Sequence, residues 1–441
     1  MSRRMRAIMA AGATLMLVAS ALPVQAAVPA ASHTLAANTQ FFVPEPDKNA
    51  VKQVVDLLKA KDAKDAFLVG SMALTPQAVW LNGGTPAAVQ KTVKQTVDVA
   101  AAFHTVPILV AYNIPFRDCA QYSAGGATDA TAYAAWIDGL AKGIGTRKAA
   151  VILEPDSLGI IPFNTDINGN AEWCQPKDAN GNPQPGADPA TRYAELNGAV
   201  NRLELQPNVS VYLDGGHSSW LGVGDMSDRL IKAGVARAQG FYLNASNYQY
   251  SPNLVQYGTW ISECIATGAP AGCPNQYWNG GPAGTEIANL LGAWNGVGLS
   301  AYGVWSDAST DPTLNTSGIN ARFTAGSGVT HFVIDSSRNG MGPWNTAPYS
   351  VGTAQDWCNP PARGVGIRPT ANTGVPLLDA YMWIKTPGQS DGACTRWASA
   401  SAGIDPVRGI ADPAAGGWFP QMALELVQNA VPAFKIPPYI K

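Results

Sequence analysis

The sequence has little charge and few side chains suited to metals or redox chemistry. Charged residues make up 14% of its 441 positions, and 29 basic against 31 acidic residues leave a formal net charge of -2. This near balance excludes a protein that binds nucleic acid through bulk charge. The four histidines lie far apart, and the sequence has no HExxH motif and no CxxC pair. We therefore expect neither a metal site nor a bound cofactor.

Long apolar runs are also absent, except at the N-terminus. Three arginines within the first six residues precede apolar residues 7–22, and Val24-Gln25-Ala26 provides small residues for cleavage. This pattern predicts a signal peptide over residues 1–26. A membrane anchor is the alternative, but the run is short for one and no stop-transfer pattern follows. We expect a mature protein that is secreted or periplasmic and has no membrane association after cleavage.

The sequence has neither a linker rich in Pro, Ser and Thr nor an internal repeat. After an N-terminal lead over residues 27–38, we expect residues 39–441 to form one domain, because α/β barrels with insertions reach about 400 residues. An even number of cysteines in an exported chain indicates disulfides, whose pairing the spacing leaves open. Cys264 and Cys273 are close enough to close one loop. The other cysteines are Cys119, Cys174, Cys358 and Cys394.

Short apolar runs alternate with helical patterns nearly to the C-terminus. The runs that predict strands are residues 66–71, 106–113, 149–154, 209–214, 241–244, 299–304, 331–335 and 380–385. The segments that predict helices include residues 48–61, 86–103, 130–144, 189–205, 225–238, 285–295 and 420–429. Alternation on this scale favours parallel βα units, and hence an α/β fold.

Polar side chains gather at the carboxyl ends of the predicted strands. They are Asn113, Glu154, Asp156, Asp214, Asn244, Asp335 and Lys385, with Asp118 and Asp391 a few residues further on. In a βα barrel the active site is built at this end of the strands. One aspartate alone is more simply explained as a helix cap or an ion-pair partner. Four or more carboxylates on one face favour a catalytic site.

Carboxylates without a metal cluster, a cysteine nucleophile or a phosphate loop suit acid and base chemistry on a glycosidic bond. One carboxyl group stays protonated and donates its proton to the leaving oxygen, while water attacks the opposite face of the sugar. Thirteen Trp and 14 Tyr provide flat rings with polar tips, which stack on sugars. Most of these rings belong in the core, but Trp80, Trp220 and Trp357 lie in sequence surroundings that favour exposed platforms.

Four blocks of the sequence, in order, resemble the signatures of glycoside hydrolase family 6, a family of cellulases. They are residues 112–119 (YNIPFRDC, with SAGG shortly after), 151–158 (VILEPDSL), 212–222 (YLDGGHSSWLG) and 366–374 (GIRPTANTG). The resemblance runs from about Phe41 to Pro432. It implies a distorted, partly open TIM-like (β/α) barrel of about seven parallel strands with long active-site loops. It also implies inverting hydrolysis of β-1,4-glucan without a cofactor.

The resemblance implies roles for single residues. Asp156 matches the general acid, and Asp118 matches the carboxylate whose negative charge keeps that acid protonated. Tyr112 matches a tyrosine that crowds the sugar at the cleavage point. Asp391 matches the proposed base, with proton removal through a second water as the alternative. The candidate substrate-binding residues are Trp80, Asp214, His217, Trp220, Asn244, Trp357, Lys385 and Gln389.

The same resemblance implies the disulfides Cys119–Cys174 and Cys358–Cys394, which leaves Cys264–Cys273 as an additional pair. Two positions depart from the family pattern. Gln389 stands where the family commonly has a glutamate, and Ala124 stands where a serine often holds the catalytic water. Neither departure changes the two matched catalytic aspartates, so we expect activity.

The expected function is that of a monomeric secreted cellulase whose partners are cellulose, other β-1,4-glucans and cello-oligosaccharides. Endo action is favoured over cellobiohydrolase action, because Cys394 would tie down only the start of the loop over residues 395–417. One rival is a non-catalytic glucan-binding protein, which would not need two neighbouring carboxylates. The other is a serine esterase using Ser218, but Trp220 stands where the nucleophile turn needs a small residue.

Overall fold

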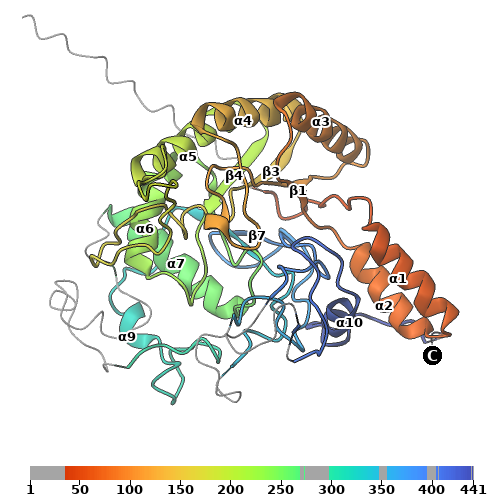
Figure 1. Ribbon diagram of the computed structural model, residues 1–441. Helices are drawn as coiled ribbons and strands as arrows, with labels where there is room; N and C mark the ends of the chain where they lie inside the picture. Colours follow the sequence, from red (N-terminus) through yellow and green to blue (C-terminus); the bar gives the residue numbers. More distant parts are fainter. Residues whose placement is uncertain are drawn as a thin grey trace, which may run out of the picture.

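The computed structural model describes residues 35–268, 273, 297–346, 355–394, 404–405, 407–438 and 440. The expected signal peptide over residues 1–26 and the predicted helix over residues 285–295 lie outside the described residues, as does much of the loop at 395–417 that bears on endo or exo action. Figure 1 shows a central sheet surrounded by helices.

Seven parallel strands form one sheet, and their spatial order is their order in the chain. They are β1 (Val79–Leu81), β2 (Ile108–Ala111), β3 (Ala149–Leu153), β4 (Val209–Asp214), β5 (Gly240–Leu243), β6 (His331–Asp335) and β7 (Leu378–Met382). The two edges approach beside β1 and β7, where the Ala78 N–H donates to the Trp383 carbonyl at 2.9 Å. The sheet is therefore a curled, partly open α/β barrel, which confirms the fold class.

Helices connect the strands and cover the outside of the sheet. They are α1 (Lys48–Lys59), α2 (Ala63–Ala73), α3 (Pro86–Ala102), α4 (Ala130–Ile144), α5 (Pro189–Leu203), α6 (Val223–Lys232), α7 (Ser251–Thr267), α9 (Ser317–Asn320) and α10 (Pro420–Gln428). In Figure 1, α3 to α7 form an arc around one side, and α1, α2 and α10 lie together on the other.

The connecting helices begin at clear capping signals. The side chains of Thr85, Asp129 and Asp188 accept hydrogen bonds from backbone N–H groups three residues further on, at 3.2, 2.9 and 2.9 Å. Proline occupies the first position of α3 and α5, where its missing N–H costs no helical hydrogen bond. These local signals explain why the predicted starts of α3, α4 and α5 are correct.

Both faces of the sheet are buried in apolar layers. Ile108 and Val110 of β2 point into the barrel, whereas Leu109 and Ala111 pack toward the helices. Strands buried on both sides have continuous apolar sequences, which is why they are visible in the sequence. A third apolar cluster joins α1, α2 and α10 to Trp383.

Two of the predicted strands are wrong. Residues 66–71 lie in α2, which begins at an Asp62 cap that accepts from the Asp65 N–H at 3.0 Å. This short apolar run is compatible with the sequence period of a strand and with that of a helix. Packing of α2 against α1 and α10 favours the helix. Residues 299–304 form no strand. The sequence pattern also misses β1, which has three residues, and α7.

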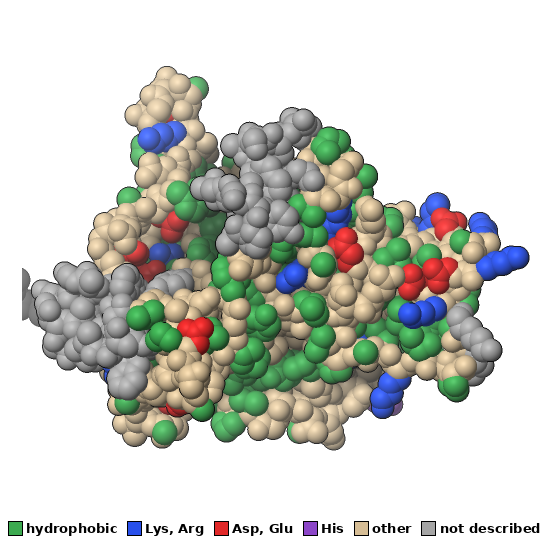
Figure 2. All heavy atoms as spheres, turned by 90° about the horizontal axis from the view of Figure 1, so that it is seen from below, with side chains coloured by type: hydrophobic (Ala, Val, Ile, Leu, Met, Phe, Trp, Pro, Cys, Tyr) green, Lys and Arg blue, Asp and Glu red, His purple; other side chains and the backbone are tan. Residues whose placement is uncertain are grey.

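In the part of the chain that the structure describes, no helix is long and apolar enough to cross a membrane. On the face shown in Figure 2, charged side chains gather at the right-hand end, where α1 and α2 lie. Exposed pairs such as Lys52 with Asp56 contribute little stability, so this charge mainly keeps the surface hydrated.

Candidate active site

A cavity of about 650 Å³ lies at the carboxyl ends of the strands. Its lining brings together residues that are far apart in the sequence. Of the candidate site residues, those that line it are Trp80, Tyr112, Asp118, Asp156, His217, Trp220, Trp357, Lys385, Gln389 and Asp391. The strand-end argument therefore locates the cavity correctly.

Asp156 lies just beyond β3, on a sharply turned segment of backbone. Glu154 and Asp156 have left-handed φ values of 53° and 66°, which are unfavourable for residues other than glycine. Asp214, at the end of β4, holds this turn by accepting hydrogen bonds from the N–H groups of Leu158 and Gly159 at 3.0 and 3.1 Å. The end of β4 thus holds the backbone turn that carries Asp156.

The environment of Asp156 favours its protonated form. Removal from bulk water is the main cause, and the negative charges of Asp214, Asp118 and Asp391 add to it, so the pKa of Asp156 is raised well above its usual range. The positive charge of Lys385 opposes this shift and is outweighed. A carboxyl group that keeps its proton near neutral pH can serve as a proton donor.

Asp118 lies on a loop that Arg117 organises. The Arg117 guanidinium donates to the carbonyls of Asn82, Tyr112 and Ser123 at 2.9, 2.5 and 2.8 Å. Asp118 has a left-handed φ of 57° and accepts from the Ser123 N–H at 2.6 Å. Burial raises the pKa of Asp118, against the opposing effects of this hydrogen bond and of Arg117.

Tyr112 lies in the wall of the cavity between a ring and a cation. Its ring makes an edge contact with Trp80 at 5.4 Å between centroids, and the Arg117 guanidinium lies 4.5 Å from the Tyr112 centroid. The Trp80 indole N–H donates to the Ile384 carbonyl at 2.8 Å, which fixes this platform beside β7. Both rings are therefore held rigidly.

Asp391 has the opposite surroundings to Asp156. Its carboxylate forms ion pairs with Arg338 at 2.8 Å and Lys385 at 3.2 Å, and accepts from the Asn359 N–H at 3.0 Å. Burial opposes ionisation, but Arg338 and Lys385 together with these hydrogen bonds hold the pKa of Asp391 below its usual value. Asp391 is therefore ionised, with both oxygens engaged.

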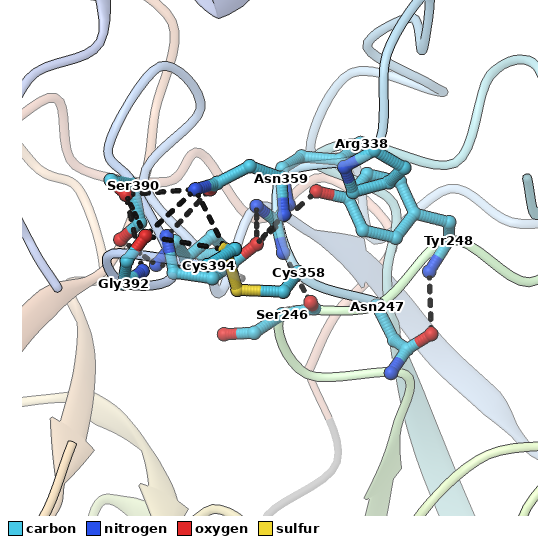
Figure 3. Close-up of polar contacts among 12 residues, drawn as sticks. Ser246, Asn247, Tyr248, Arg338, Cys358, Asn359, Ser390, Gly392 and Cys394 are labelled. Atoms are coloured by element: carbon cyan, nitrogen blue, oxygen red, sulfur yellow. Dashed lines mark hydrogen bonds and ion pairs between the residues drawn. A yellow bond between two sulfur atoms is a disulfide. The ribbon is translucent and has the colours of Figure 1, made fainter. Parts of the chain in front are cut away.

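Asn359 joins its own loop to the loop of Asp391, and Figure 3 shows its contacts with Ser390 and Gly392 on either side of that residue. The Asn359 amide nitrogen donates to the Ser390 hydroxyl and the Gly392 carbonyl, both at 3.0 Å, and its oxygen accepts from the Asp391 N–H at 2.7 Å. The Cys358–Cys394 disulfide links the same two loops. These contacts fix the Asp391 backbone from two sides.

The structure contains the two disulfides that the resemblance implied, Cys119–Cys174 and Cys358–Cys394. It also contains the additional pair, Cys264–Cys273. The Cys119–Cys174 disulfide joins the residue after Asp118 to the insertion between β3 and α5. Two of the three disulfides thus lie next to loops that carry aspartates of the cavity.

His217 and Trp220 form the wall beyond β4. Loss of hydration lowers the pKa of His217 to about 3, so its ring is neutral. The Trp220 ring lies so close to Gly159 that a Cβ there would be 2.2 Å from the indole, which explains the glycine. Ser218 is only 1% exposed and is not in the cavity lining, so it offers an esterase no accessible nucleophile.

Asp214 and Asn244, two of the candidate substrate-binding residues, are not in the cavity lining. Both residues are buried, and their side chains form hydrogen bonds with backbone groups behind the cavity wall. Asn244 donates to the Asp335 carbonyl at 2.8 Å and accepts from the Gln249 N–H at 3.0 Å. Their geometry is that of positioning residues.

Gln389 lines the cavity, but its amide donates to Asp47 at 3.2 Å. Lys385 instead donates to the Ser390 carbonyl at 3.1 Å and pairs with Asp391. Lys385 therefore still has a carboxylate partner, Asp391, although position 389 is a glutamine and not a glutamate. Ser123, next to Ala124, lines the cavity and its N–H contacts Asp118.

Sequence reasoning missed several residues of the cavity and its support. Tyr122 and Trp173 line the cavity, and Arg338 and Asn359 support Asp391. Arg338 was detectable, since it follows the carboxyl end of β6 by three residues. Asn359 gives no signal, because its loop lies in no strand or helix and meets Asp391 only in the folded chain.

Glu154, at the end of β3, is fully buried behind the cavity. Its carboxyl group accepts from the N–H groups of Asn113 and Ile114 at 2.8 and 2.9 Å. Burial raises the pKa of Glu154 to about 8, against these hydrogen bonds and the charge of Arg192. Glu154 therefore joins the loops of Asp118 and Asp156 without reaching the cavity.

Fold and cavity together define a class of protein. Protonated and ionised carboxyl groups share one cavity with exposed aromatic rings at the carboxyl ends of parallel strands, which is the equipment of a glycosidase. Within the described residues, no three His, Cys, Asp or Glu side chains are grouped so as to hold a metal ion.

The chain belongs to glycosyl hydrolases family 6. The profile of that family, described as "Glycosyl hydrolases family 6", matches residues 36–430. The chain is 32% identical over 405 residues to Endoglucanase 1 of Streptomyces halstedii, covering 91% of this chain and 96% of that protein. It is 30% identical over 408 residues to Endoglucanase A of Thermobispora bispora, covering 92% of this chain and 66% of that protein. A third relative, Endoglucanase A of Cellulomonas fimi, is matched over 58% of its length, so the chain spans under two thirds of two of these relatives.

The structure is similar to that of the endoglucanase Cel6 from Mycobacterium tuberculosis, solved in complex with methyl-cellobiosyl-4-deoxy-4-thio-β-D-cellobioside. The TM-score is 0.60 at 30% sequence identity, and the match covers 90% of this chain and 99% of that one. Cellobiohydrolase II from Humicola insolens has a TM-score of 0.58 at 22% identity, which supports the shared fold. The family resemblance seen in the four sequence blocks is confirmed.

Proposed function

We propose that the protein hydrolyses β-1,4-glucosidic bonds of cellulose and related glucans with inversion at the anomeric carbon. The observation that carries the proposal is the opposite charge state of two aspartates in one cavity. Asp156 keeps its proton, while Asp391 is held ionised by Arg338 and Lys385. A protonated acid together with a fixed negative charge matches the needs of glycoside cleavage.

In the proposed reaction Asp156 donates its proton to the leaving oxygen, while a water molecule attacks the opposite face of the sugar. Burial is the main reason that Asp156 keeps its proton, and the negative charges of Asp214 and Asp118 add to this effect. Tyr112, held by Trp80 and Arg117, crowds the sugar at the cleavage point and favours its distorted ring.

Asp391 acts on the reaction mainly through its charge. Both of its oxygens are engaged, and its low pKa makes it a weak acceptor for a proton. We therefore propose that it stabilises positive charge developing on the sugar and orients the attacking water. The proton of that water then leaves through a second water molecule to bulk solvent, from which Asp156 regains the proton that it gave to the leaving oxygen.

Proton NMR of fresh product tests inversion directly. Wild-type protein and Asp156→Asn are mixed with cellopentaose, and the anomeric signals are followed over the first minutes. We expect the α-anomer first from wild type and no product from the variant. An initial β-anomer contradicts inversion. If wild type binds the oligosaccharide but releases no product, the protein is a glucan-binding protein.

We propose endo action, in agreement with the names of the endoglucanases to which the chain is similar. The test compares the fall in viscosity of carboxymethylcellulose with the release of reducing ends. Endo action lowers viscosity steeply while few ends are released. A nearly constant viscosity during extensive release of cellobiose contradicts it.

We also propose export with cleavage after Ala26, on the pattern of the first 26 residues. N-terminal sequencing of protein recovered from the culture medium tests this. A sequence beginning at Ala27 supports the proposal. Full-length protein retained in the membrane contradicts it and favours an anchor.

A further inference from the structure

Trp173 belongs to an insertion between β3 and α5 and is placed unlike the other tryptophans of the wall. Its side chain is 52% exposed, yet it lines the same cavity as Asp156 and Trp220. A large apolar ring exposed to water is unfavourable, and a ligand that covers it would gain free energy from the hydrophobic effect. No role for Trp173 follows from the family signatures in this chain, since it lies between the second and third sequence blocks.

The insertion that carries Trp173 is firmly attached. The next residue, Cys174, forms the disulfide with Cys119, and the Cys174 carbonyl accepts from the Phe163 N–H at 2.9 Å. The preceding residue, Glu172, pairs with Arg229 of α6 at 3.6 Å. Exposure of the Trp173 ring is therefore not a consequence of a loose loop, because the backbone is held on both sides.

The same attachments place Trp173 at one end of the cleft. Arg229 belongs to α6. Asp225 of the same helix accepts a hydrogen bond from the Ile167 N–H of the insertion at 3.4 Å. The loop that begins α6 carries Trp220. In Figure 1 the yellow loops of the insertion lie beside α5 and α6.

Trp80 lies at the other end. It belongs to β1 and bonds to Ile384 beyond β7, at the seam of the barrel, whereas Trp220 follows β4 in the middle of the strand order. A glucan chain that runs across the cavity from Trp80 to Trp220 would continue toward Trp173. Flat indole faces suit sugar rings, which have apolar faces and hydroxyl edges.

We propose that Trp173 forms an additional sugar-binding subsite at the Trp220 end of the cleft, which is occupied only by longer β-1,4-glucan chains. This inference rests on the proposed function of the same cavity. It makes Trp173 a determinant of chain-length preference and not a catalytic residue. The insertion, fixed by the Cys119–Cys174 disulfide, then serves as the support of this platform.

The test compares kcat/KM on cellotriose and on cellohexaose for wild type and Trp173→Ala. We expect the variant to lose on the order of tenfold on cellohexaose and less than about twofold on cellotriose, since only the longer chain reaches the ring. The loss should lie mainly in KM, and Trp173→Phe should recover most of it. Phe103→Ala, which removes an exposed ring at the end of α3, is the matched control and should leave both values unchanged.

Binding provides a second measurement that does not depend on turnover. In an Asp156→Asn background, adding Trp173→Ala should weaken cellohexaose binding in a calorimetric titration by a similar factor and leave cellotriose binding unchanged. Equal losses on both oligosaccharides, or no loss on either, overturn the subsite while leaving glucan hydrolysis intact. A wild-type protein that cleaves no glucan overturns the proposed function and this inference with it.

Discussion

The two walls of the cavity use the same kind of side chain, but the pKa values of these side chains are shifted in opposite directions. On the wall beyond β2 and β3, Asp118 and Asp156 have raised pKa values. On the wall beyond β7, Asp391 is also buried but has a lowered pKa, because Arg338 and Lys385 contact it. Burial alone therefore does not decide whether an aspartate in this cavity is ionised. Cations in contact with the carboxylate lower its pKa in spite of burial, as Arg338 and Lys385 do for Asp391.

The two walls also differ in how they are held. The first depends on strained backbone, with left-handed φ values at Asp118, Glu154 and Asp156, and on carboxylates that accept from backbone N–H groups. The second depends on side chains that cross between loops, chiefly Arg338 and Asn359. We expect substitutions of Asp118 and Asp156 in the first wall to affect mainly catalysis, and substitutions in the second wall to affect mainly stability.

Asp156→Asn should give the largest loss of activity. The variant keeps the shape of the side chain but has no proton to donate, so kcat on cellopentaose should fall by about 10³- to 10⁴-fold. Initial rates of reducing-end release provide the measurement. An aryl cellobioside with a good leaving group, which needs less protonation, should lose much less. Equal losses on both substrates would contradict the acid role.

Asp391→Asn should cause the largest loss of stability. It leaves the buried Arg338 without its charged partner, which costs about 3 kcal/mol or more in the free energy of unfolding. Asp156→Asn replaces a carboxyl group that is already uncharged, and should change that free energy by less than about 1 kcal/mol. Urea unfolding of the two variants side by side checks the contrast. Similar values for both would show that the two walls do not differ as described.

Asp118→Asn should shift the pH dependence of activity. The charge of Asp118 helps to raise the pKa of Asp156, so its removal should lower that pKa. The alkaline limb of the kcat/KM profile should then move to lower pH, and activity near pH 7 should fall by about tenfold. Glu45→Gln, which changes an exposed carboxylate outside the cavity lining, is the control. An unchanged alkaline limb would contradict the electrostatic role of Asp118.

Glu154→Gln should have the smallest effect, and it should depend on pH. The pKa of Glu154 is raised to about 8, so its neutral form stabilises the fold below its unfolded pKa, and this stability is lost as the pH rises toward 8 and above. At pH 5 the variant should unfold within about 1 kcal/mol of wild type. At pH 9 it should be the more stable of the two. Thermal unfolding at both pH values measures this, and a constant difference would exclude a raised pKa.

The sequence predicted the parts of the fold whose local and tertiary preferences agree. Six of the seven strands were visible because both faces of the barrel bury apolar residues, as in β3 and β4. The failures are residues 66–71, where a short apolar run fits two periods, and β1, which is too short for a pattern. The strand-end argument found the cavity, but it also selected Asp214 and Asn244, which serve backbone groups behind the wall.

What the sequence determined by itself is the family, the polar residues at the ends of the strands, and three aspartates of the cavity lining, Asp118, Asp156 and Asp391. These are properties of short blocks in which the informative residues are neighbours. Tertiary structure decided which of these aspartates is ionised. Asp391 depends on Arg338 and Asn359, which lie more than 30 residues before it and contact it only when β6, β7 and their loops come together. A pKa responds to charges and water within a few ångströms, whatever their separation along the chain, so the folded structure alone distinguishes the acid from the fixed negative charge.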